Sequence, residues 1–198
     1  MVFVFDLDDT LSETDLYSEK YISEFINKNN LPYKQIAKDV RFAERKFDWS
    51  TETALKWYKT FGDDMMLEFP LKKGAIEFLN FLHENGCKIV IATARATDWH
   101  TNPEEITIKW LKDNKIPYDT VYVGRRDKEK ICEEVDADYF IDDDVSIVES
   151  VANYFLLSKR KKQAFLLTTN YNKNLSISNN VVRVKDFDEL KNYFNKNV

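Results

Sequence analysis

Cysteine and histidine are scarce in this sequence, with two of each. Cys87 and Cys132 both fall in segments with the pattern of regular secondary structure, which favours buried free thiols over a disulfide, a metal site or a nucleophile. Neither His83 nor His100 pairs with a cysteine at the spacing of zinc ligands, so nothing in the sequence indicates a zinc site. We expect His83 to lie on the surface of a helix.

Long apolar runs and a basic surplus are also absent. The apolar residues 1–5 meet Asp6 directly, far short of the apolar region of a signal peptide or a membrane span, which predicts a cytoplasmic protein with no membrane partner. The net charge of −5 argues against nucleic acid as a partner, because duplex binding normally requires a basic surface. The one obvious basic run, 159–162, suits a solvated helix end.

The sequence does contain a regular alternation of two patterns. Short apolar segments rich in β-branched and aromatic residues alternate with segments of helical periodicity, which is typical of a parallel sheet covered on both faces. The expected strands are 2–5, 88–92, 121–123, 139–141, 164–167 and 181–184. The expected helices are 75–84, 104–113, 128–134, 147–157 and 189–194. This order predicts an α/β fold with a doubly wound, Rossmann-like parallel sheet.

One interval interrupts the alternation. Between Ser12 and Phe69 no segment resembles a buried strand, and the apolar residues there follow helical spacing. Those on the first helical face are Tyr17, Tyr21, Ile22, Phe25 and Ile26. We therefore interpret residues 12–69 as a helical cap subdomain inserted after the first strand, and residues 1–11 and 70–198 as the α/β core.

Aspartates follow two of the expected strands at the point where each strand ends. Asp6, Asp8 and Asp9 come after the first strand, and residues 142–144 come after the fourth. Because parallel strands end at one edge of the sheet, both groups are expected to meet there. Two ionised carboxylates about 4 Å apart repel by roughly 4 kcal/mol at an effective dielectric of about 20, so such a group needs protons or a cation. Hard oxygen ligands of this kind favour Mg²⁺.

Two further polar groups fall at the ends of the strands in between. An isolated pair of aspartates would be explained as helix caps, which favour this residue. Here Thr93 closes the second strand, and Lys128 lies just beyond the third, so four strands bring polar groups to one edge. Lys130 is an alternative to Lys128 at the third position, and we prefer Lys128 because it opens the following helix.

The residues of these four strand ends resemble the motifs of the haloacid dehalogenase (HAD) superfamily. Residues 6–11, with the sequence DLDDTL after an apolar strand, are similar to the first motif of that family. Thr93, Lys128 and the pair Asp142 and Asp143 follow in the order of its second, third and fourth motifs. The resemblance covers nearly the whole chain, and it implies a phosphatase in which the inserted helical segment is the cap.

The resemblance also implies a role for each matching residue. Asp6 would be the nucleophile that forms an aspartyl-phosphate, and Asp8 the general acid and base. Asp6, the backbone carbonyl of Asp8 and Asp142 would bind Mg²⁺. Asp143 would hold a water molecule on the metal or orient Lys128. The catalytic set is completed by Thr93 and Lys128, which would bind the phosphate and offset its charge.

Within the superfamily, the chain most resembles the cytosolic 5'(3')-deoxyribonucleotidases. The supporting segments are 93–95, 107–111 and 116–119, with the fourth motif and residues 171–172. The chain departs from that group at Asn170, where proline is expected, and at Asp144, where arginine is common. The implied substrate is a small phosphorylated metabolite, namely a nucleotide. A monomer and a homodimer are both compatible with the sequence.

The expected substrate contacts come from two parts of the chain. On the core side they are Thr93, Ala94 and Arg95, with His100, Arg125 and Arg126 as further candidates. On the cap side, aromatic residues could stack on a nucleobase. Among Phe47, Trp49, Trp57, Tyr58 and Phe61, we select Phe47 and Trp49, because residues 46–50 lack clean helical periodicity.

Other functions remain open at this point. A 3'-phosphatase that acts on polynucleotides shares the fold and a similar layout of the second and fourth motifs, although the lack of positive charge disfavours a polymer substrate. A signalling receiver module also accepts phosphate on an aspartate, but its phosphorylated residue follows the third strand and no helical insertion follows the first. A non-catalytic, metal-binding relative would lack one of the catalytic positions, and none is missing here.

Overall fold

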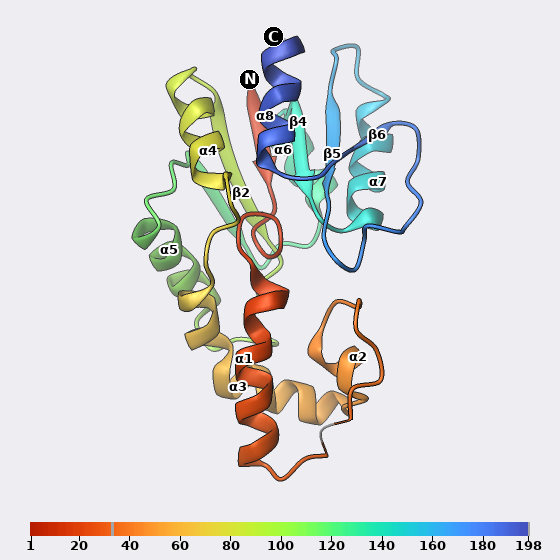
Figure 1. Cartoon of the computed structure of the whole chain (residues 1–198). Coiled ribbons are helices and arrows are strands. Elements are labelled where there is room, and N and C mark those ends of the chain that lie inside the picture. The colour runs from red at the N-terminus through yellow and green to blue at the C-terminus, as the bar shows by residue number, and fades with distance from the viewer. Residues whose placement is uncertain (33, 198) are drawn as a thin grey trace.

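The computed structural model describes residues 1–32 and 34–197. Its centre is a sheet of six parallel strands in the order β3-β2-β1-β4-β5-β6, with β1 at an interior position (Figure 1). The strands are β1 Val2–Phe5, β2 Lys88–Thr93, β3 Thr120–Val123, β4 Tyr139–Asp142, β5 Gln163–Leu167 and β6 Val181–Val184. The helices are α1 Thr14–Lys28, α2 Ala43–Phe47, α3 Thr51–Glu68, α4 Ala75–Glu84, α5 Pro103–Asp113, α6 Lys128–Glu134, α7 Val145–Phe155 and α8 Phe187–Asn197. The predicted α/β fold is confirmed.

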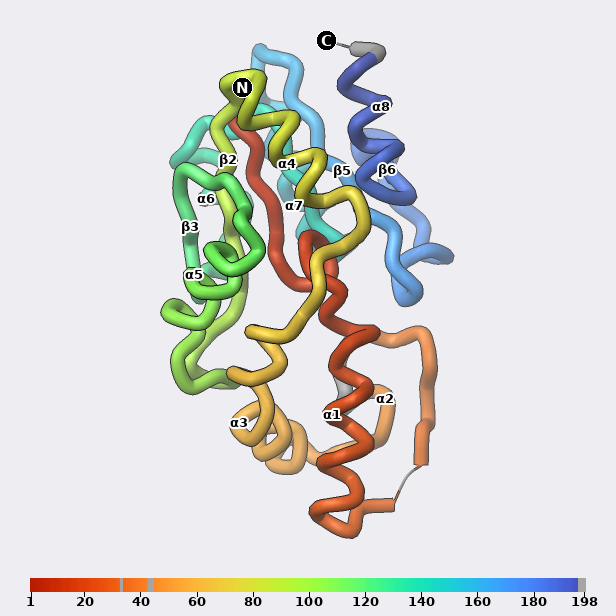
Figure 2. Tube along the Cα trace, turned by 60° about the vertical axis from the view of Figure 1, so that its left-hand side comes forward, coloured from red at the N-terminus to blue at the C-terminus, as the bar shows by residue number. Residues whose placement is uncertain are grey.

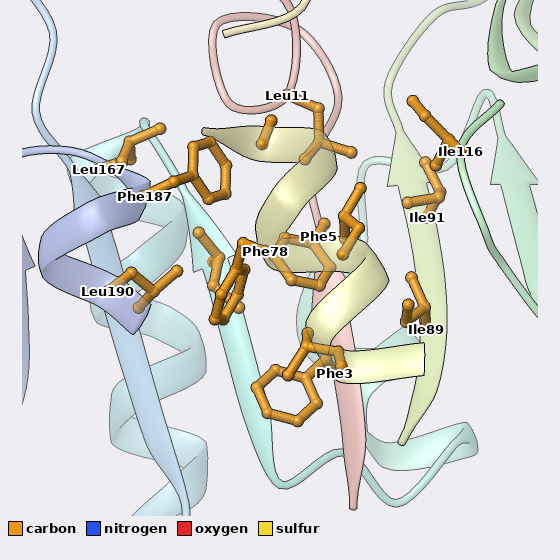
Figure 3. Packing of buried hydrophobic residues seen from close by; sticks show 14 of the residues in the cluster. Phe3, Phe5, Leu11, Phe78, Ile89, Ile91, Ile116, Leu167, Phe187 and Leu190 are labelled. Atoms are coloured by element: carbon orange, nitrogen blue, oxygen red, sulfur yellow. The ribbon is translucent and has the colours of Figure 1, made fainter. Parts of the chain in front are cut away.

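Helices cover both faces of the sheet, because its apolar strands bury side chains on alternate sides. On one face, Phe3 and Phe5 of β1 pack with Phe78 of α4 and with Phe187 and Leu190 of α8 (Figure 3). On the other face, Val4 belongs to a separate cluster built with α6 and α7. The sheet, whose strands are the apolar runs of the sequence, is thus the middle layer, with a layer of helices on each face.

Helices α1, α2 and α3 lie together beyond the carboxyl edge of the sheet, on the side away from both termini (Figures 1 and 2). They are held by their own apolar cluster, which includes Ile22 and Phe25 of α1 and Trp57 and Met65 of α3. No strand occurs in this interval among the residues that the structure describes. Hereafter, residues 12–69 are called the cap segment.

The chain enters and leaves the cap segment at adjacent points. Glu13 N donates a hydrogen bond to the carbonyl of Pro70 (2.9 Å), and Lys72 N donates one to the carbonyl of Leu11 (2.8 Å). Ser12 and Leu71 form an antiparallel bridge between the two crossings. The cap segment is therefore connected to the sheet at the loop that follows β1, directly beside the aspartates of that loop. Within the described ranges, no helix is long and apolar enough to cross a membrane.

Candidate active site

Three carboxylates meet where β1 and β4 end. Asp6 follows β1, Asp142 is the last residue of β4, and Asp143 comes next, and one oxygen from each lies within 4.8 Å of the others. All three are buried. The parallel pairing of β1 with β4, in which Phe5 lies opposite Ile141, brings the two groups to the same height. The structure thus brings together the aspartates that the sequence places at separate strand ends.

Lys128 is the cation of this cluster. Its Nζ donates a 2.6 Å hydrogen bond to Asp6 Oδ1 and another to the carbonyl of Ala92, and the residue is 2% exposed at the start of α6. Lys130 lies on the same helix but is exposed. Of the two candidate lysines, the geometry therefore brings Lys128 to the carboxylate. Its charge and the hydrogen bond favour an ionised Asp6.

Asp8 has a different environment, although it is only two residues away. Arg95 donates from Nε to Asp8 Oδ2 (2.9 Å) and from Nη2 to Oδ1 (2.7 Å). The Thr14 hydroxyl donates to Oδ1 (3.0 Å), and Thr93 Oγ1 lies 3.5 Å from Oδ2. Burial disfavours the Asp8 charge, but the Arg95 guanidinium more than compensates and lowers the pKa of Asp8 to about 2.

The pKa values of Asp6 and Asp142 are shifted in the opposite direction. Burial, together with Asp143 and Asp8, raises the pKa of Asp6 to about 6 against the opposing effect of Lys128. Burial and the neighbouring Asp6 and Asp143 raise the pKa of Asp142 well above its usual value. Asp142 Oδ2 is also buried without any hydrogen-bond partner in the described structure. An orphaned carboxylate oxygen beside two further acids fits a hard divalent cation.

Asp143 is fixed from several directions. Thr10 Oγ1 donates to its Oδ1 (2.9 Å), the Tyr171 hydroxyl donates to its Oδ2, and Asn172 Nδ2 donates to its backbone carbonyl (2.8 Å). Tyr171 also lies 3.2 Å from Asp9 Oδ2. Burial, followed by the negative Asp143, raises the pKa of Asp9 to about 7. Thr10 and Tyr171 therefore orient the acids without contributing an ionised group.

A cavity of about 480 Å³ opens above these groups. Its polar side includes Asp6, Asp8, Asp142 and Lys128. Much of its apolar side is formed by the cap segment and the loop after β2, and includes Trp57, Tyr58, Met65, Met66, Phe69 and Trp99. The cavity is therefore charged where the strands end, and the cap segment adds aromatic and methionine side chains together with a few charged ones, namely Asp15, Arg41 and Arg45.

The loop after β2 is held against α3 by close contacts. Lys59 Nζ donates to the carbonyls of Thr97 (2.7 Å) and His100 (3.0 Å). A Cβ placed on Gly62 would lie 2.7 Å from His100 Nδ1, so the imidazole can pack on the helix only because this position is glycine. Burial lowers the pKa of His100 to about 4, and its Nδ1 has no partner in the described structure. A neutral His100 thus lines the cavity.

Some of the remaining predicted substrate contacts line the cavity in the structure, and the others do not. Ala94 and Arg95 line the cavity, as does Arg126. Phe47 and Trp49 instead lie in the cap's own apolar cluster, where their rings stack at 5.4 Å, and neither lines the cavity. Arg125 is directed to Asp127 and Glu134 through hydrogen bonds of 2.6–3.0 Å. The aromatic residues that line the cavity are Phe42, Trp57, Tyr58, Phe69 and Trp99.

Sequence reasoning missed several residues that the structure brings to the acids. Thr10, Thr14, Arg41 and Tyr171 all contact an aspartate of the site, yet none was named as a site residue from the sequence. Thr10 could have been found from its place in the first motif. Arg41 carries no such signal, because it lies in an irregular stretch of the cap segment.

Comparison with known proteins agrees with this geometry. A family model described as haloacid dehalogenase-like hydrolase matches residues 1–168. A protein of Oceanobacillus iheyensis named "Putative nucleotidase" is 25% identical over 196 residues, covering 96% of this chain and 99% of that protein. The chain therefore belongs to the haloacid dehalogenase-like hydrolases.

Solved structures of the family share the fold. A haloacid dehalogenase-like family protein of Streptococcus pneumoniae superposes with a TM-score of 0.69 at 16% identity, covering 98% of this chain and 97% of that one. A heptose bisphosphate phosphatase of B. bronchiseptica, complexed with magnesium and phosphate, superposes with a TM-score of 0.57 at 11% identity, covering 100% and 99%. These likenesses extend over the cap segment as well as the sheet.

Proposed function

We propose that this hydrolase is a Mg²⁺-dependent phosphatase that acts on nucleoside 5'-monophosphates, of ribose or deoxyribose, through an aspartyl-phosphate on Asp6. The observation that carries the proposal is the arrangement around Asp6. Its carboxylate accepts a 2.6 Å hydrogen bond from Lys128 and lies within 4.8 Å of Asp142 and Asp143, at the floor of the cavity. A nucleophilic carboxylate can approach a phosphate only where cations offset the repulsion.

The residues present fit a magnesium ion. Asp6, Asp142 and the backbone carbonyl of Asp8 would hold it, and Asp142 Oδ2 is a buried oxygen that has no other described partner. When bound, Mg²⁺ would neutralise charge on the nucleophile and the phosphate. Thr10 and Tyr171 hold the carboxylate of Asp143 beside these metal ligands. Asp143 is a separate group from the proposed nucleophile, Asp6.

In the proposed reaction, Asp6 attacks phosphorus and the bond from phosphorus to the ester oxygen breaks. The leaving oxygen takes a proton from Asp8, and in the second step Asp8 removes a proton from the water that releases the phosphate. In the arrangement described here, Arg95 holds Asp8 as a carboxylate, which is the form that the second step requires. The first step requires Arg95 to release Asp8, and a phosphate dianion at Asp6 is a competing partner for its guanidinium.

The apolar side of the cavity supports a nucleotide as the substrate. Trp57, Tyr58 and Trp99 place aromatic rings there, with Tyr58 and Trp99 at 5.2 Å in an edge-to-face arrangement. A cavity of about 480 Å³ falls in the range typical of small-molecule sites. Every nucleobase has an aromatic face that can stack on an aromatic side chain. The apolar side of the cavity can therefore hold a nucleoside while the phosphate reaches Asp6.

The test is a comparison of phosphate esters with Mg²⁺ present and with Mg²⁺ chelated. We expect nucleoside 5'-monophosphates to be hydrolysed faster, by kcat/KM, than sugar phosphates or 3'-phosphorylated oligonucleotides, and chelation to abolish turnover. Asp6→Asn should be inactive. Asp113→Asn removes a carboxylate from the surface of α5, where it pairs with Lys109 alone among described residues, and should be as active as the unmodified protein. Preference for the oligonucleotide would instead indicate a polynucleotide 3'-phosphatase, and turnover by Asp6→Asn would contradict the proposed nucleophile.

A further inference from the structure

Arg41 brings a guanidinium from the cap segment to the acids of the sheet edge. It lies in the irregular stretch between α1 and α2, about 100 residues before the fourth strand. Its Nη1 donates a 3.1 Å hydrogen bond to Asp144 Oδ2 and lies 3.7 Å from Asp143 Oδ2. The cap segment thus places one cation directly beside the carboxylates that surround Asp6.

The side chain is held in place but is not enclosed. Asp144 caps α7 with its Oδ1, which accepts from Ser146 N (2.9 Å) and Ile147 N (3.3 Å), so that Oδ2 remains for Arg41. The rings of Phe42 and Tyr171 lie 5.1 and 5.9 Å from the guanidinium carbon. The Arg41 side chain is nevertheless 23% exposed, and it lines the cavity together with Asp6 and Lys128.

Arg41 has nitrogens that are still free to donate hydrogen bonds, whereas Lys128 and Arg95 already donate to the acids or the backbone of the site. Lys128 donates to Asp6 and Ala92, and Arg95 is bound to Asp8 through two nitrogens. Only Nη1 of Arg41 donates a hydrogen bond within the described chain, so Nε and Nη2 are free to donate. The planar guanidinium fork matches two oxygens of a phosphate group.

Arg126 is another arginine that could serve this purpose, and its position is weaker. It lines the cavity, but its side chain is 65% exposed and its nearest acid is the exposed Asp98, at 4.0 Å. Among the described residues, no hydrogen bond or ion pair fixes its guanidinium toward Asp6. Arg41 is both oriented by Asp144 and partly free, which is the combination that preorganised anion binding requires.

We propose that Arg41 is a substrate-binding residue that clamps the phosphate at Asp6, donating from Nε and Nη2 to its non-bridging oxygens while Nη1 stays on Asp144. This inference rests on the proposed function and assigns the cap segment a part in binding the phosphate itself. Because the same side chain joins the cap segment to the fourth-strand loop, phosphate at Asp6 would also hold the cap segment against the sheet edge.

The experiment measures the affinity of inorganic phosphate by calorimetric titration with Mg²⁺ present, alongside KM for a nucleoside monophosphate. Loss of two charge-assisted hydrogen bonds should weaken phosphate binding by about 10- to 100-fold in Arg41→Gln and raise KM similarly. Arg41→Lys keeps the charge without the fork and should lie in between. Lys38→Gln removes one positive charge from an exposed position in the same stretch and should bind phosphate normally.

The variant Asp144→Asn distinguishes a role of Arg41 in phosphate binding from a role that is only structural. Asparagine still caps α7 but removes the charge that pairs with Arg41. If Arg41 only fastened the cap segment, Asp144→Asn and Arg41→Gln would be equally harmful. We expect Asp144→Asn to weaken phosphate binding less than Arg41→Gln does, because the asparagine side chain still offers Arg41 an oxygen and the guanidinium itself is retained.

Three results would overturn the inference. Unchanged phosphate affinity in Arg41→Gln would remove the role of Arg41 and leave the proposed phosphatase activity intact. Equal losses in Asp144→Asn and Arg41→Gln would make Arg41 a structural tie. Absence of phosphate binding by the unmodified protein with Mg²⁺ would reject the proposed function together with this inference. Recovery in Arg41→Lys shows that loss in Arg41→Gln does not come from misfolding.

Discussion

The two sides of the cavity are built on different principles. On the sheet side, buried ionised groups are held one by one, as Lys128 holds Asp6 and Arg95 holds Asp8. On the cap side, the wall combines aromatic and methionine side chains with polar residues, among them Asp15, Arg41 and Arg45. The comparison indicates that the strand-end loops determine the reaction, whereas the cap segment determines which leaving group can be accommodated. Among these polar residues, Arg41 is the one that brings positive charge to Asp143 and Asp144 on the sheet side.

The largest effect should come from breaking the sheet side at Lys128. Lys128→Ala leaves the buried Asp6 without its cation, so that the carboxylate protonates more readily and the phosphate loses a charged partner. We expect kcat to fall by about 10²- to 10³-fold, measured by steady-state kinetics with Mg²⁺ at saturation. Lys130→Ala, on the exposed face of the same helix, is the matched control and should retain activity. Equal losses in both variants would contradict the assignment.

The next largest effect should come from the cap-facing wall. Trp99→Leu removes an aromatic ring from the cavity and should raise KM for nucleoside monophosphates by about tenfold, with little change for acetyl phosphate, which has no base. Trp49→Leu alters a ring that stacks on Phe47 inside the cap cluster and should leave both KM values unchanged. A rise of KM in Trp49→Leu alone would move the base site to residues 47–49, as the sequence had suggested.

The acids also predict how pH and Mg²⁺ act on stability. Without metal, Asp6 and Asp9 have pKa values near 6 and 7, above the value of 3.8 expected in an unfolded chain. The folded state therefore binds more protons between pH 4 and 7, and its stability falls as pH rises through that window. Because the proposed Mg²⁺ would compete with the proton on Asp6, the rise in Tm on adding Mg²⁺ should be several degrees larger at pH 8 than at pH 5. Thermal melts at the two pH values, with and without Mg²⁺, measure this difference in Tm.

A matched variant makes the metal prediction specific. Asp142→Asn removes the carboxylate whose Oδ2 has no described partner, and should remove most of the Mg²⁺-dependent rise in Tm at pH 8. Asp113→Asn, far from the acids on α5, should keep it. An equal rise in Tm at both pH values, or one that survives in Asp142→Asn, would contradict a metal site at this edge.

The smallest effect concerns the contact that joins the two sides. Gly62→Ala places a methyl group 2.7 Å from His100 Nδ1, so the loop after β2 must move away from α3. The crowding costs about 1–3 kcal/mol and is partly offset by the better helix propensity of alanine, so we expect Tm to fall by roughly 2–4 °C. In a His100→Ala background the same substitution should instead be neutral or stabilising. A fall of the same size in both backgrounds would exclude His100 as the cause.

The fold was predictable because its strands are short apolar runs that alternate with helices. The strands that begin at residues 2, 88 and 139 lie where the sequence predicts them, since a strand buried on both faces carries an unmistakable pattern. The groups at the strand ends were predictable for the same reason. Once the strands are parallel, Asp6, Lys128 and Asp142 must come to one edge.

The cap-side residues could not be predicted by the same reasoning. Arg41 reaches Asp144 through an irregular stretch, whose path depends on how the whole cap segment packs. Aromatic spacing did not distinguish the rings that face the cavity from those inside the cap, so Phe47 and Trp49 were preferred to Trp57 and Tyr58, and Trp99 was not considered. Contacts made by loops and between subdomains carry no periodicity that a sequence could show.

The most direct test of the proposed chemistry is to trap the phosphorylated aspartate. Borohydride reduces an aspartyl-phosphate, so a protein quenched during turnover of a nucleoside monophosphate with Mg²⁺ would carry homoserine in place of that aspartate, which peptide mass spectrometry can locate. We expect homoserine at position 6, and none when Mg²⁺ is chelated. Homoserine at position 8, 142 or 143, or steady turnover with no trapped residue at all, would contradict Asp6 as the nucleophile.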